Sequence, residues 1–339
     1  MQDKKVIVYG AYGHTGKFVV AQLCLQGFLP ILCGRDRDKL SNFSQQYPNL
    51  KTAVADINDP TSLDNAFMQA DIIVNCAGPY LDTAEPVIQS ALRLGKHYID
   101  LSAEQKAVLD VYEKFSDDAK QAGVLIIPAV AFFGGLGDLL SSSVTQGWKE
   151  VYDIKIYIGL DSWHPTKGTR LTGERNHYQR FELADGQLQP LERSYTVNWN
   201  FPAPIDTKEM VAVPLSEIIT IARHLNVKNV KTFLSKNAID DIGSEETPEP
   251  RPVDKKRRSS QHFCMQVVAT KDSISHTIIA QGQDIYAVTA PLVVETVKRI
   301  FIGNFKTNGV TTLGQTFDAS DFLKSLVSDD ITISPIKEV

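Results

Sequence analysis

The chain has 339 residues, 43% of them apolar and 22% charged, which is typical of a globular protein with room for two domains or one large α/β domain. Lys plus Arg number 35 and Asp plus Glu 40, and the formal charge of −5 does not indicate a nucleic-acid partner. The 4 cysteines occur singly, without Cys-x-x-Cys or metal-ligand spacing to histidine, so we expect no metal site and buried thiols in a reducing compartment.

The start of the sequence and its apolar runs favour a cytoplasmic location. The first residues, Met-Gln-Asp-Lys-Lys, lead into a predicted strand without the apolar core of a signal peptide. The longest uncharged apolar run, Val124 to Gly137, is too short and too rich in glycine to span a bilayer. We therefore expect no integral membrane segment.

A glycine-rich turn near the start is the strongest single signal. Val6 to Tyr9 is apolar or aromatic, Gly10, Gly13 and Gly16 follow, and an apolar helix pattern comes after them. A strand, a tight turn and a helix in this order let the backbone approach a pyrophosphate, which the free N–H groups and positive dipole of the helix bind. The turn is one residue longer than the usual G-x-G-x-x-G, and the alternative is a turn that only packs a helix on a strand. We expect cofactor contacts from Gly10, Tyr12, Gly13, His14, Thr15 and Gly16.

The end of the second predicted strand indicates which dinucleotide binds. This strand, Pro30 to Cys33, leads into Gly34 and Arg35. In a dinucleotide fold, an acidic residue about 20 residues past the glycine turn binds the ribose 2′-hydroxyl, whereas an arginine there accommodates a 2′-phosphate. Arg35 therefore favours NADP(H) over NAD(H). The neighbouring Asp36 complicates this interpretation, and a solvated loop arginine is the alternative.

Two further strand ends offer cofactor contacts. Asp56 closes the third predicted strand, and it is left for the cofactor because Asp59 fits the N-cap of the next helix, with Pro60 at its first position. A turn cap is the alternative for Asp56. The fourth predicted strand starts at Ile72 and is a continuous apolar run, typical of a strand buried on both faces. Its carboxyl end places Ala77, Gly78 and Pro79 near the ribose and nicotinamide of the cofactor.

The alternation of strands and helices predicts the architecture of residues 1–130. The helix after the glycine turn and the helix patterns at 38–46, 60–69, 84–94 and 107–122 separate six predicted strands, the last of them at 124–130. This rhythm is typical of βαβ units. We predict an α/β fold of the Rossmann type, a doubly wound parallel sheet that binds NADP.

The composition changes after residue 130, and the pattern becomes that of a second domain. Ile154, Ile156 and Ile158 alternate as in a sheet with one buried face, and 181–191 is typical of a β-hairpin. Residues 262–270 and 275–281 alternate as two antiparallel strands. We predict an inserted α+β substrate domain with a mainly antiparallel sheet at 131–284. The C-terminal helical segment, 285–339, is expected to pack back on the Rossmann domain.

Two features of the second domain have competing interpretations. Trp199 and Phe201 lie near several prolines and line an apolar pocket or form part of a core. Residues 244–261 contain three prolines and then the run Lys255 to Arg258, which is typical of a solvated, mobile loop. A nucleic-acid role for this run has little support in a net acidic chain.

Five motifs together resemble those of the saccharopine dehydrogenase-like oxidoreductases: GAYGHTG, Gly34-Arg35, NCAGPY (75–80), YIDLSAE (98–104) and GGLGDLL (134–140). The family includes saccharopine reductases and the trans-acting enoyl reductases of lipid synthesis. Its pattern after the fifth strand is usually Tyr-x-Asp-x-x-Gly-Glu, and here Ala103 replaces the glycine. The segment GVTTLGQTFDASDFLKSL (309–326) looks like the end of the enoyl reductase-like branch.

The resemblance implies an NAD(P)-dependent oxidoreductase and a cleft between the two domains. It places Gly168, Thr169 and Arg170 at the start of a helix facing that cleft, where Arg170 anchors a carboxylate or phosphate of the substrate. A surface arginine near a helix N-terminus is the alternative. The candidate substrate-binding residues are thus Ser102 and Arg170.

The catalytic residues are not identified by the sequence. Tyr80, Tyr98 and Glu104 follow strand ends and are the candidates for a proton donor, but no Tyr-x-x-x-Lys pair accompanies them. For Asp100 and Glu104 a structural role, capping a helix or bonding backbone amides, is favoured. Asp138 is expected to cap the helix that follows it.

Three functions remain open at this point. The leading one is NADPH-dependent reduction of an apolar or lipid-linked substrate. The second is an amino-acid dehydrogenase that forms or cleaves a secondary amine, as saccharopine enzymes do, and the third is a dinucleotide-binding regulatory protein without catalysis. The expected partner is a small molecule or lipid-linked substrate, not a nucleic acid, and self-association into a homodimer is left open.

Overall fold

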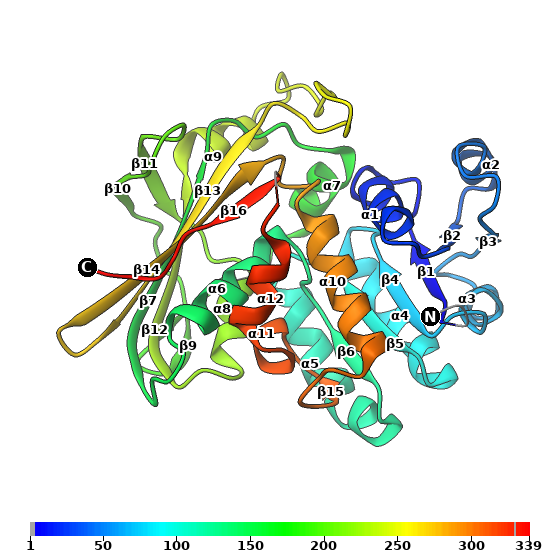
Figure 1. The fold of residues 1–339 in the computed structure, drawn as a ribbon, viewed down its shortest axis with the longest axis horizontal. Coiled ribbons are helices and arrows are strands. Elements are labelled where there is room, and N and C mark those ends of the chain that lie inside the picture. Colours follow the sequence, from blue (N-terminus) through cyan, green and yellow to red (C-terminus); the bar gives the residue numbers. More distant parts are fainter. Residues whose placement is uncertain (1–3, 329) are drawn as a thin grey trace.

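The chain folds around two β-sheets that share one apolar core (Figure 1). A computed structural model of the protein describes residues 4–328 and 330–339. The blue and cyan amino-terminal part in Figure 1 contains most of the first sheet, and green to red strands form the second. The core contains side chains from both sheets, so the two parts are packed together through an apolar seam.

The first sheet consists of 7 strands in the order β15-β6-β5-β4-β1-β2-β3, and every pair is parallel. Aliphatic residues dominate it, and β1, β2, β4 and β6 are buried along their whole length, as expected for strands covered on both faces. The order reverses between β1 and β4, which marks the switch point where ligands bind in such folds. The bounds are β1 Val6–Tyr9, β2 Ile31–Gly34, β3 Thr52–Val54, β4 Ile72–Asn75, β5 His97–Asp100, β6 Leu125–Ile127 and β15 Gly309–Val310.

Five helices connect these strands: α1 His14–Leu25, α2 Arg37–Ser44, α3 Pro60–Phe67, α4 Tyr80–Leu94 and α5 Gln105–Ala122. Asp59 caps α3 through Thr61 N and Ser62 N, and α4 and α5 end at left-handed Gly95 and Gly123, as the sequence predicts. Helix α4 begins four residues earlier than its apolar periodicity indicates, because the polar Asp82 and Thr83 of its first turn interrupt that periodicity. The prediction of a doubly wound parallel sheet is confirmed.

The second sheet consists of 10 strands and is mainly antiparallel, as predicted. Its pairs in the described residues are antiparallel except β7 with β12, which run parallel. Asp185 and Gly186 both have positive φ and form the turn of the predicted β8–β9 hairpin. The bounds are β7 Val151–Leu160, β8 Phe181–Ala184, β9 Gln187–Pro190, β10 Thr196–Asn200, β11 Thr207–Ala212, β12 Val227–Ser235, β13 His262–Lys271, β14 Ile274–Gln283, β16 Ile331–Ile333 and β17 Lys337–Glu338.

The remaining helices lie between the sheets or over the edges of the second one: α6 Gly137–Val144, α7 Lys167–Arg175, α8 Ser216–Ala222, α9 Lys236–Gly243, α10 Thr289–Ile302, α11 Leu313–Thr316 and α12 Ala319–Leu326. The carboxyl-terminal part of the chain contributes a strand to the first sheet and strands to the second. Helix α10 packs against α1 and β15 extends the first sheet, whereas α12 packs on α6 and β16 pairs with β14 (Figure 1).

The seam between the two parts depends on the glycines that follow β6. Gly134 has φ +90°, and a Cβ there would lie 2.7 Å from both Ala129 Cβ and Ser216 Oγ. Its N–H donates to Glu217 Oε2 at 3.0 Å. The turn Phe132–Leu136 can approach α8 this closely only because glycine carries no side chain.

Asp138 does not cap α6, so that prediction is wrong. It lies inside the first turn of α6, with its carboxylate 2.6 Å from His224 Nε2 and accepting the Gly314 N–H at 2.7 Å. Both partners are distant in sequence. Asp138 therefore ties α6 to the ends of α8 and α11 in place of capping its own helix.

The aromatic residues of β10 are part of a small second core. Trp199 stacks on Tyr157 of β7 with ring centroids 3.7 Å apart, and Tyr157 stacks in turn on Phe233 of β12. Phe201 is buried in the same cluster. These contacts favour the core interpretation of Trp199 and Phe201.

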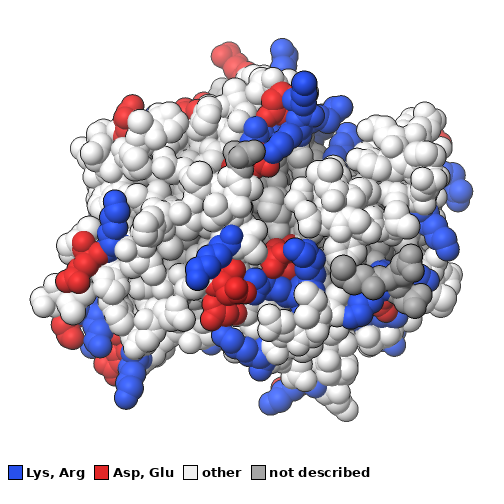
Figure 2. All heavy atoms as spheres, viewed as in Figure 1, with Lys and Arg blue, Asp and Glu red and all other residues white. Residues whose placement is uncertain are grey.

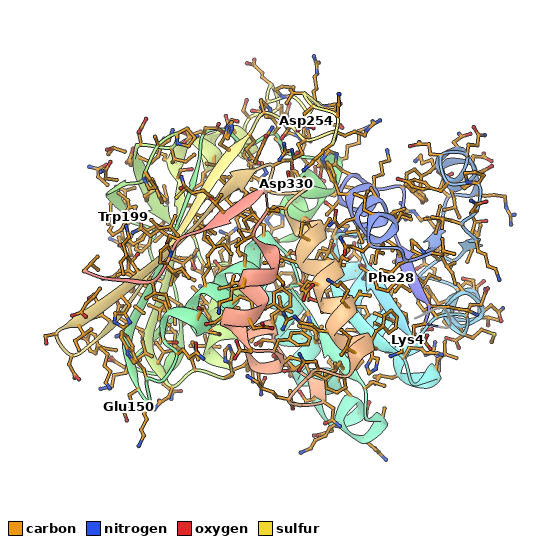
Figure 3. The ribbon with its side chains drawn as sticks, in the orientation of Figure 1. Lys4, Phe28, Glu150, Trp199, Asp254 and Asp330 are labelled. Carbon is orange, nitrogen blue, oxygen red and sulfur yellow. The ribbon has the colours of Figure 1, made fainter. Side chains whose placement is uncertain are left out.

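The basic run Lys255–Arg258 is partly anchored. Figure 2 shows basic side chains gathered at the top of the molecule, where this loop lies, and Lys255, Lys256 and Arg257 are exposed as expected. Arg258 bonds both Asp254 and Asp330, which are labelled in Figure 3, at 2.7 Å each. Lys256 also pairs with Asp330 at 2.7 Å, so Lys256 and Arg258 both fasten the loop to the segment before β16.

In the part of the chain that the structure describes, no helix has the length and apolar character needed to cross a membrane.

Candidate cofactor site

The turn between β1 and α1 brings the ends of β1, β2 and β4 together. Gly10 has φ +82°, and the N–H groups of Gly10 and Ala11 both donate to Cys33 O at the end of β2. A Cβ at Gly10 would lie 2.9 Å from Ala77 N, after β4. The turn is therefore built at the switch point of the sheet, with backbone on both sides.

The three-residue spacing of the glycines has a steric cause. Gly13 N donates to Gly10 O at 2.9 Å, which closes the turn. A Cβ at Gly16 would lie 2.2 Å from the same Gly10 oxygen, and a Cβ at Gly13 would lie 3.1 Å from it. The turn thus folds back onto the first turn of α1. The longer motif fits because glycine at positions 13 and 16 places no side chain against the Gly10 oxygen.

The amino-terminal end of α1 is open to an anion. Gly13 occupies the N-cap position, no side chain caps the helix, and no acidic residue lies in its first turn. Backbone N–H groups there have no intrahelical partner and carry the positive end of the helix dipole. His14 and Thr15 begin this helix and are half-buried. The geometry is that of a phosphate cradle.

The ring of His14 adds an unsatisfied polar group to the same place. Its Nε2 is buried and has no hydrogen-bond partner among the described residues. Phe18 and Tyr286 contact the ring edge to face, with centroids 5.4 and 5.1 Å away. Burial lowers the pKa of the imidazole, which keeps it neutral at physiological pH.

The end of β2 is shaped by Tyr12. Its hydroxyl accepts the Asp36 N–H at 3.0 Å, and a Cβ at Gly34 would lie 2.5 Å from its ring. Gly34 is therefore required by the Tyr12 ring, a reason that the sequence did not reveal. Arg35 is exposed, and within residues 4–328 and 330–339 no carboxylate forms an ion pair with it.

The two carboxylates near this end are occupied. Asp36 caps α2 by accepting the Lys39 N–H at 3.0 Å, and this bond lowers the pKa of the Asp36 carboxyl. Asp56 accepts both the main-chain and side-chain N–H groups of Asn58, at 2.9 and 3.0 Å. Because Asp36 is engaged in this cap, it forms no ion pair with Arg35. The turn-cap alternative describes the observed contacts of Asp56.

The loop after β4 is held by buried Asn75. Its Nδ2 donates to Thr83 and to the Tyr98 hydroxyl, and its Oδ1 accepts the Ala77 N–H at 3.0 Å. Thr83 donates to Ala77 O at 2.6 Å. These bonds fix Ala77, Gly78 and Pro79 as a rigid, small-residue loop beside the glycine turn.

Tyr98 and Ser102 belong to a closed network around Asp100. The Asp100 carboxylate accepts bonds from the Tyr98 hydroxyl, the Ser102 N–H, the Ser102 hydroxyl and the Ala129 N–H at 2.7 to 2.9 Å. All three side chains are completely buried. Burial raises the pKa of Asp100, and that of Tyr98 as well. These contacts favour a structural role for Tyr98 and Ser102 over the predicted roles of proton donor and substrate contact.

Glu104 has the structural role that the sequence favoured for it. Its carboxylate accepts the N–H groups of Ala103 and Tyr80, at 2.9 and 3.3 Å, and is buried. It is therefore not placed as a proton donor. Tyr80 lies at the start of α4 next to Gly78, where a Cβ would be 3.6 Å from its ring, and burial raises the pKa of its hydroxyl.

Helix α7 covers the β4–α4 loop from the second part of the molecule. Thr172 lies 3.5 Å from the Cβ position of Gly78, and Arg175 forms an ion pair with Asp82 at 3.2 Å. Arg170, in contrast, donates to the carbonyl oxygens of Ile242, Ser244 and Thr247. These contacts agree with a structural role for Arg170, which ties α7 to the segment after α9.

The residues at the ends of β1, β2 and β4 fit a dinucleotide. They combine a turn that any Cβ would obstruct, an uncapped helix end, an unpaired arginine and an unsatisfied imidazole nitrogen. The residue that sequence reasoning missed is Tyr286, which reaches His14 from beyond residue 280. No spacing in the sequence could have signalled that contact.

Comparisons with known proteins agree with this geometry. Residues 6–127 match the family model described as the saccharopine dehydrogenase NADP binding domain. A saccharopine dehydrogenase-like oxidoreductase of Bos taurus is 32% identical over 145 residues, 38% of this chain and 34% of the relative. The trans-acting enoyl reductase of Mycobacterium ulcerans is 26% identical over 140 residues, 39% of this chain and 33% of the relative. The matches thus span about a third of the length of these relatives.

A solved structure covers the whole chain. Apo saccharopine dehydrogenase (L-Glu forming) from Saccharomyces cerevisiae superposes with a TM-score of 0.69 over 99% of this chain and 100% of that chain. The identity is only 11%, so this likeness shows the fold. Together the comparisons confirm the family resemblance, the fold class, and an NADP-binding domain of the kind found in NAD(P)-dependent oxidoreductases.

Proposed function

We propose, from the match of residues 6–127 to the saccharopine dehydrogenase NADP binding domain, that the chain catalyses NADPH-dependent reduction of an apolar or lipid-linked substrate. The observation that carries the proposal is the β1–α1 turn, which offers an uncapped helix end at the switch point of the sheet. The pyrophosphate binds the N–H groups of the first turn of α1, over Gly10, Gly13 and Gly16. Tyr12, His14 and Thr15 flank it.

Arg35 binds the 2′-phosphate in this proposal. It follows β2 directly, is exposed, and has no ion-pair partner among the described residues. Asp36, which would favour a 2′-hydroxyl, is turned into the N-cap of α2. A guanidinium donates two parallel hydrogen bonds to a phosphate, so the free arginine selects NADP(H) over NAD(H).

When bound, NADPH supplies a hydride, and the residues of this chain position it and provide the proton. The rigid loop Ala77 to Pro79 contacts the ribose and nicotinamide side. Tyr80 is the proton donor of the proposal, because it lies against Gly78 in this loop, whereas Tyr98 and Glu104 are committed to hydrogen bonds with neighbouring groups. Tyr80 is buried too, and burial raises the pKa of its hydroxyl, which is therefore protonated at neutral pH and holds its proton more tightly than a free tyrosine.

The two arginines of α7, Arg170 and Arg175, already have partners within the protein, which favours an apolar substrate over an amino acid. A secondary-amine substrate needs free cations for its carboxylates, and Arg170 and Arg175 are the basic residues expected for that purpose. Arg170 donates to three carbonyl oxygens and Arg175 pairs with Asp82. The relative from Mycobacterium ulcerans carries the name of an enoyl reductase, which agrees with the lipid-linked alternative.

Titration with NADPH and NADH in parallel tests the cofactor assignment. We expect the wild type to bind NADPH at least roughly tenfold tighter than NADH, and Arg35→Ala to lose about 10- to 100-fold in NADPH affinity with little change for NADH. Arg37→Ala is the matched control, because Arg37 is an exposed arginine two residues away that begins α2. Equal losses in both variants would contradict the role of Arg35.

Turnover separates the remaining functions. Consumption of NADPH with a carbon–carbon double bond or another apolar acceptor supports the proposal, and formation of a secondary amine supports the amino-acid alternative. Cofactor binding without turnover on either class of substrate supports the regulatory alternative. A cytoplasmic location is part of the proposal, supported by four cysteines that are all free thiols, and fractionation of the tagged protein tests it.

A further inference from the structure

Helix α7 is an exposed helix fixed at both ends to the cofactor site. None of its residues is buried. Thr166 caps its start by accepting the Thr169 N–H at 3.1 Å, and Arg175 at its end pairs with Asp82 of α4. Because no residue of α7 is buried, its position depends on these polar attachments and on Arg170, which donates to carbonyl oxygens of residues 242–247.

Tyr286 is the attachment at the amino-terminal end of α7. Its hydroxyl accepts the Trp163 Nε1–H at 2.9 Å and lies 2.9 Å from Thr169 Oγ1. The Thr166 N–H and the His164 carbonyl oxygen lie 3.4 Å away. One hydroxyl thus contacts the segment before α7, its capping residue and its first turn.

The ring of Tyr286 contacts the cofactor turn on its other side. It meets the His14 imidazole edge to face at 5.1 Å, and His14 is the first residue of α1. The Tyr286 backbone is held in place, because its N–H donates to the buried carboxylate of Asp284 at 2.9 Å. The Tyr286 side chain thus contacts the first residue of α1 with its ring and the start of α7 with its hydroxyl.

The two ends of α7 correspond to the two ends of the expected cofactor path. Tyr286 and His14 lie at the pyrophosphate turn, and Thr172 and Arg175 lie over the β4–α4 loop. Resting on the proposed function, we propose that Tyr286 is a positioning residue through which cofactor binding at the β1–α1 turn orders α7 over the β4–α4 loop. The helix α7, already folded in the free protein, is then held more firmly over the substrate side when the cofactor is bound.

Hydrogen–deuterium exchange of residues 167–175, with and without saturating NADPH, tests this coupling. In the wild type we expect NADPH to slow exchange roughly tenfold, which is within the usual range of coupling between sites. Tyr286→Phe keeps the contact with His14 but removes the hydroxyl, and should lose most of this protection. Its NADPH affinity should change by less than about twofold, because α7 is already folded in the free protein.

A purely structural role would give a different result. If Tyr286 had only this role, Tyr286→Phe would speed exchange of α7 equally with and without NADPH. The ratio of the exchange rates without and with NADPH would then remain as in the wild type. Tyr152→Phe is the matched control, since Tyr152 lies on β7 with an exposed side chain. Thr169→Val removes the facing hydroxyl and replaces Tyr286→Phe if that variant does not fold.

The outcomes are distinguishable. Exchange of α7 that does not respond to bound NADPH in the wild type overturns the coupling and leaves the cofactor assignment intact. If NADPH slows exchange of α7 as much in Tyr286→Phe and Thr169→Val as in the wild type, the Tyr286 hydroxyl does not transmit the effect of cofactor binding. Failure of NADPH to bind the wild type, seen in the titration, overturns the proposed function and the coupling with it.

Discussion

Two neighbouring groups of strand ends in the first sheet, here called edges, differ in whether their polar groups have hydrogen-bond partners. At the ends of β1 and β2, the first turn of α1 is uncapped, Nε2 of His14 has no partner, and Arg35 forms no ion pair among the described residues. At the ends of β4 and β5, the side chains of Asn75, Tyr98 and Asp100 bond one another or the backbone and are completely buried. The first edge is built from backbone, the second from polar side chains.

The difference distinguishes a surface that can bind a ligand from a framework that holds the loops in position. Buried polar groups are normally paired, so groups left free at a strand end mark a place where a ligand completes the bonding. A network whose members are all satisfied holds loops in position but offers nothing to a ligand. Tyr98, Ser102 and Glu104 look catalytic in sequence because they follow strands, and the structure assigns them to the framework.

The largest effect is expected at the backbone-built edge. In Gly16→Ala the new Cβ would lie 2.2 Å from Gly10 O, a main-chain atom that cannot move without opening the turn. We expect NADPH affinity to fall more than about 100-fold and the free energy of unfolding to fall by about 3 kcal/mol. Calorimetric titration and urea unfolding measure the two effects.

Gly27→Ala is the control for glycine replacement as such. Gly27 has φ +80° and nothing within 4 Å of its Cβ position. Only backbone strain of about 1–2 kcal/mol is expected there, with unchanged affinity. If both variants bind NADPH equally well, the turn is not the cofactor site.

An intermediate effect, on stability alone, is expected in the framework. Tyr98→Phe leaves Asn75 Nδ2 and Asp100 Oδ2 each without one buried partner and should cost about 1–3 kcal/mol of unfolding free energy. NADPH affinity should remain within about twofold of the wild type, because Tyr98 is not exposed to the ligand.

Tyr112→Phe provides the matched comparison for Tyr98→Phe. The Tyr112 hydroxyl is buried without a partner among the described residues, so its removal should leave stability unchanged or raise it slightly. Loss of NADPH binding in Tyr98→Phe at full stability would place Tyr98 in the site and remove the distinction between the two edges.

The smallest effect is expected for Asp56→Ala. Its carboxylate accepts two bonds from Asn58, so the substitution should cost about 1 kcal/mol of stability and change NADPH affinity by less than about twofold. Asn58→Ala leaves the carboxylate in place and removes only the side-chain bond, because alanine keeps the main-chain N–H, so it should cost less stability than Asp56→Ala. An affinity loss of about tenfold in Asp56→Ala alone would restore Asp56 as an adenine contact.

Local patterns were sufficient for much of the fold. The β1–α1 turn, the Asp59 cap with Pro60 behind it, and the left-handed glycines ending α4 and α5 all depend on interactions within a few residues. The β8–β9 hairpin and the β13–β14 pair were visible for the same reason. The place of β15 was not visible, because a two-residue strand far along the chain completes a sheet whose other strands end by residue 127.

Short-range patterns were enough to predict the kind of sheet, the turn expected to bind the cofactor and the arginine expected to select NADP(H), because each is a local arrangement of backbone and one or two side chains. Which polar residues remain without a partner became visible only in the folded chain. Asp100 accepts a hydrogen bond from the Ala129 N–H, Arg170 donates to the segment after α9, and the Tyr286 ring contacts His14. Whether a side chain can act on a ligand depends on partners brought close by folding, and their distance along the chain carries no signal in the sequence.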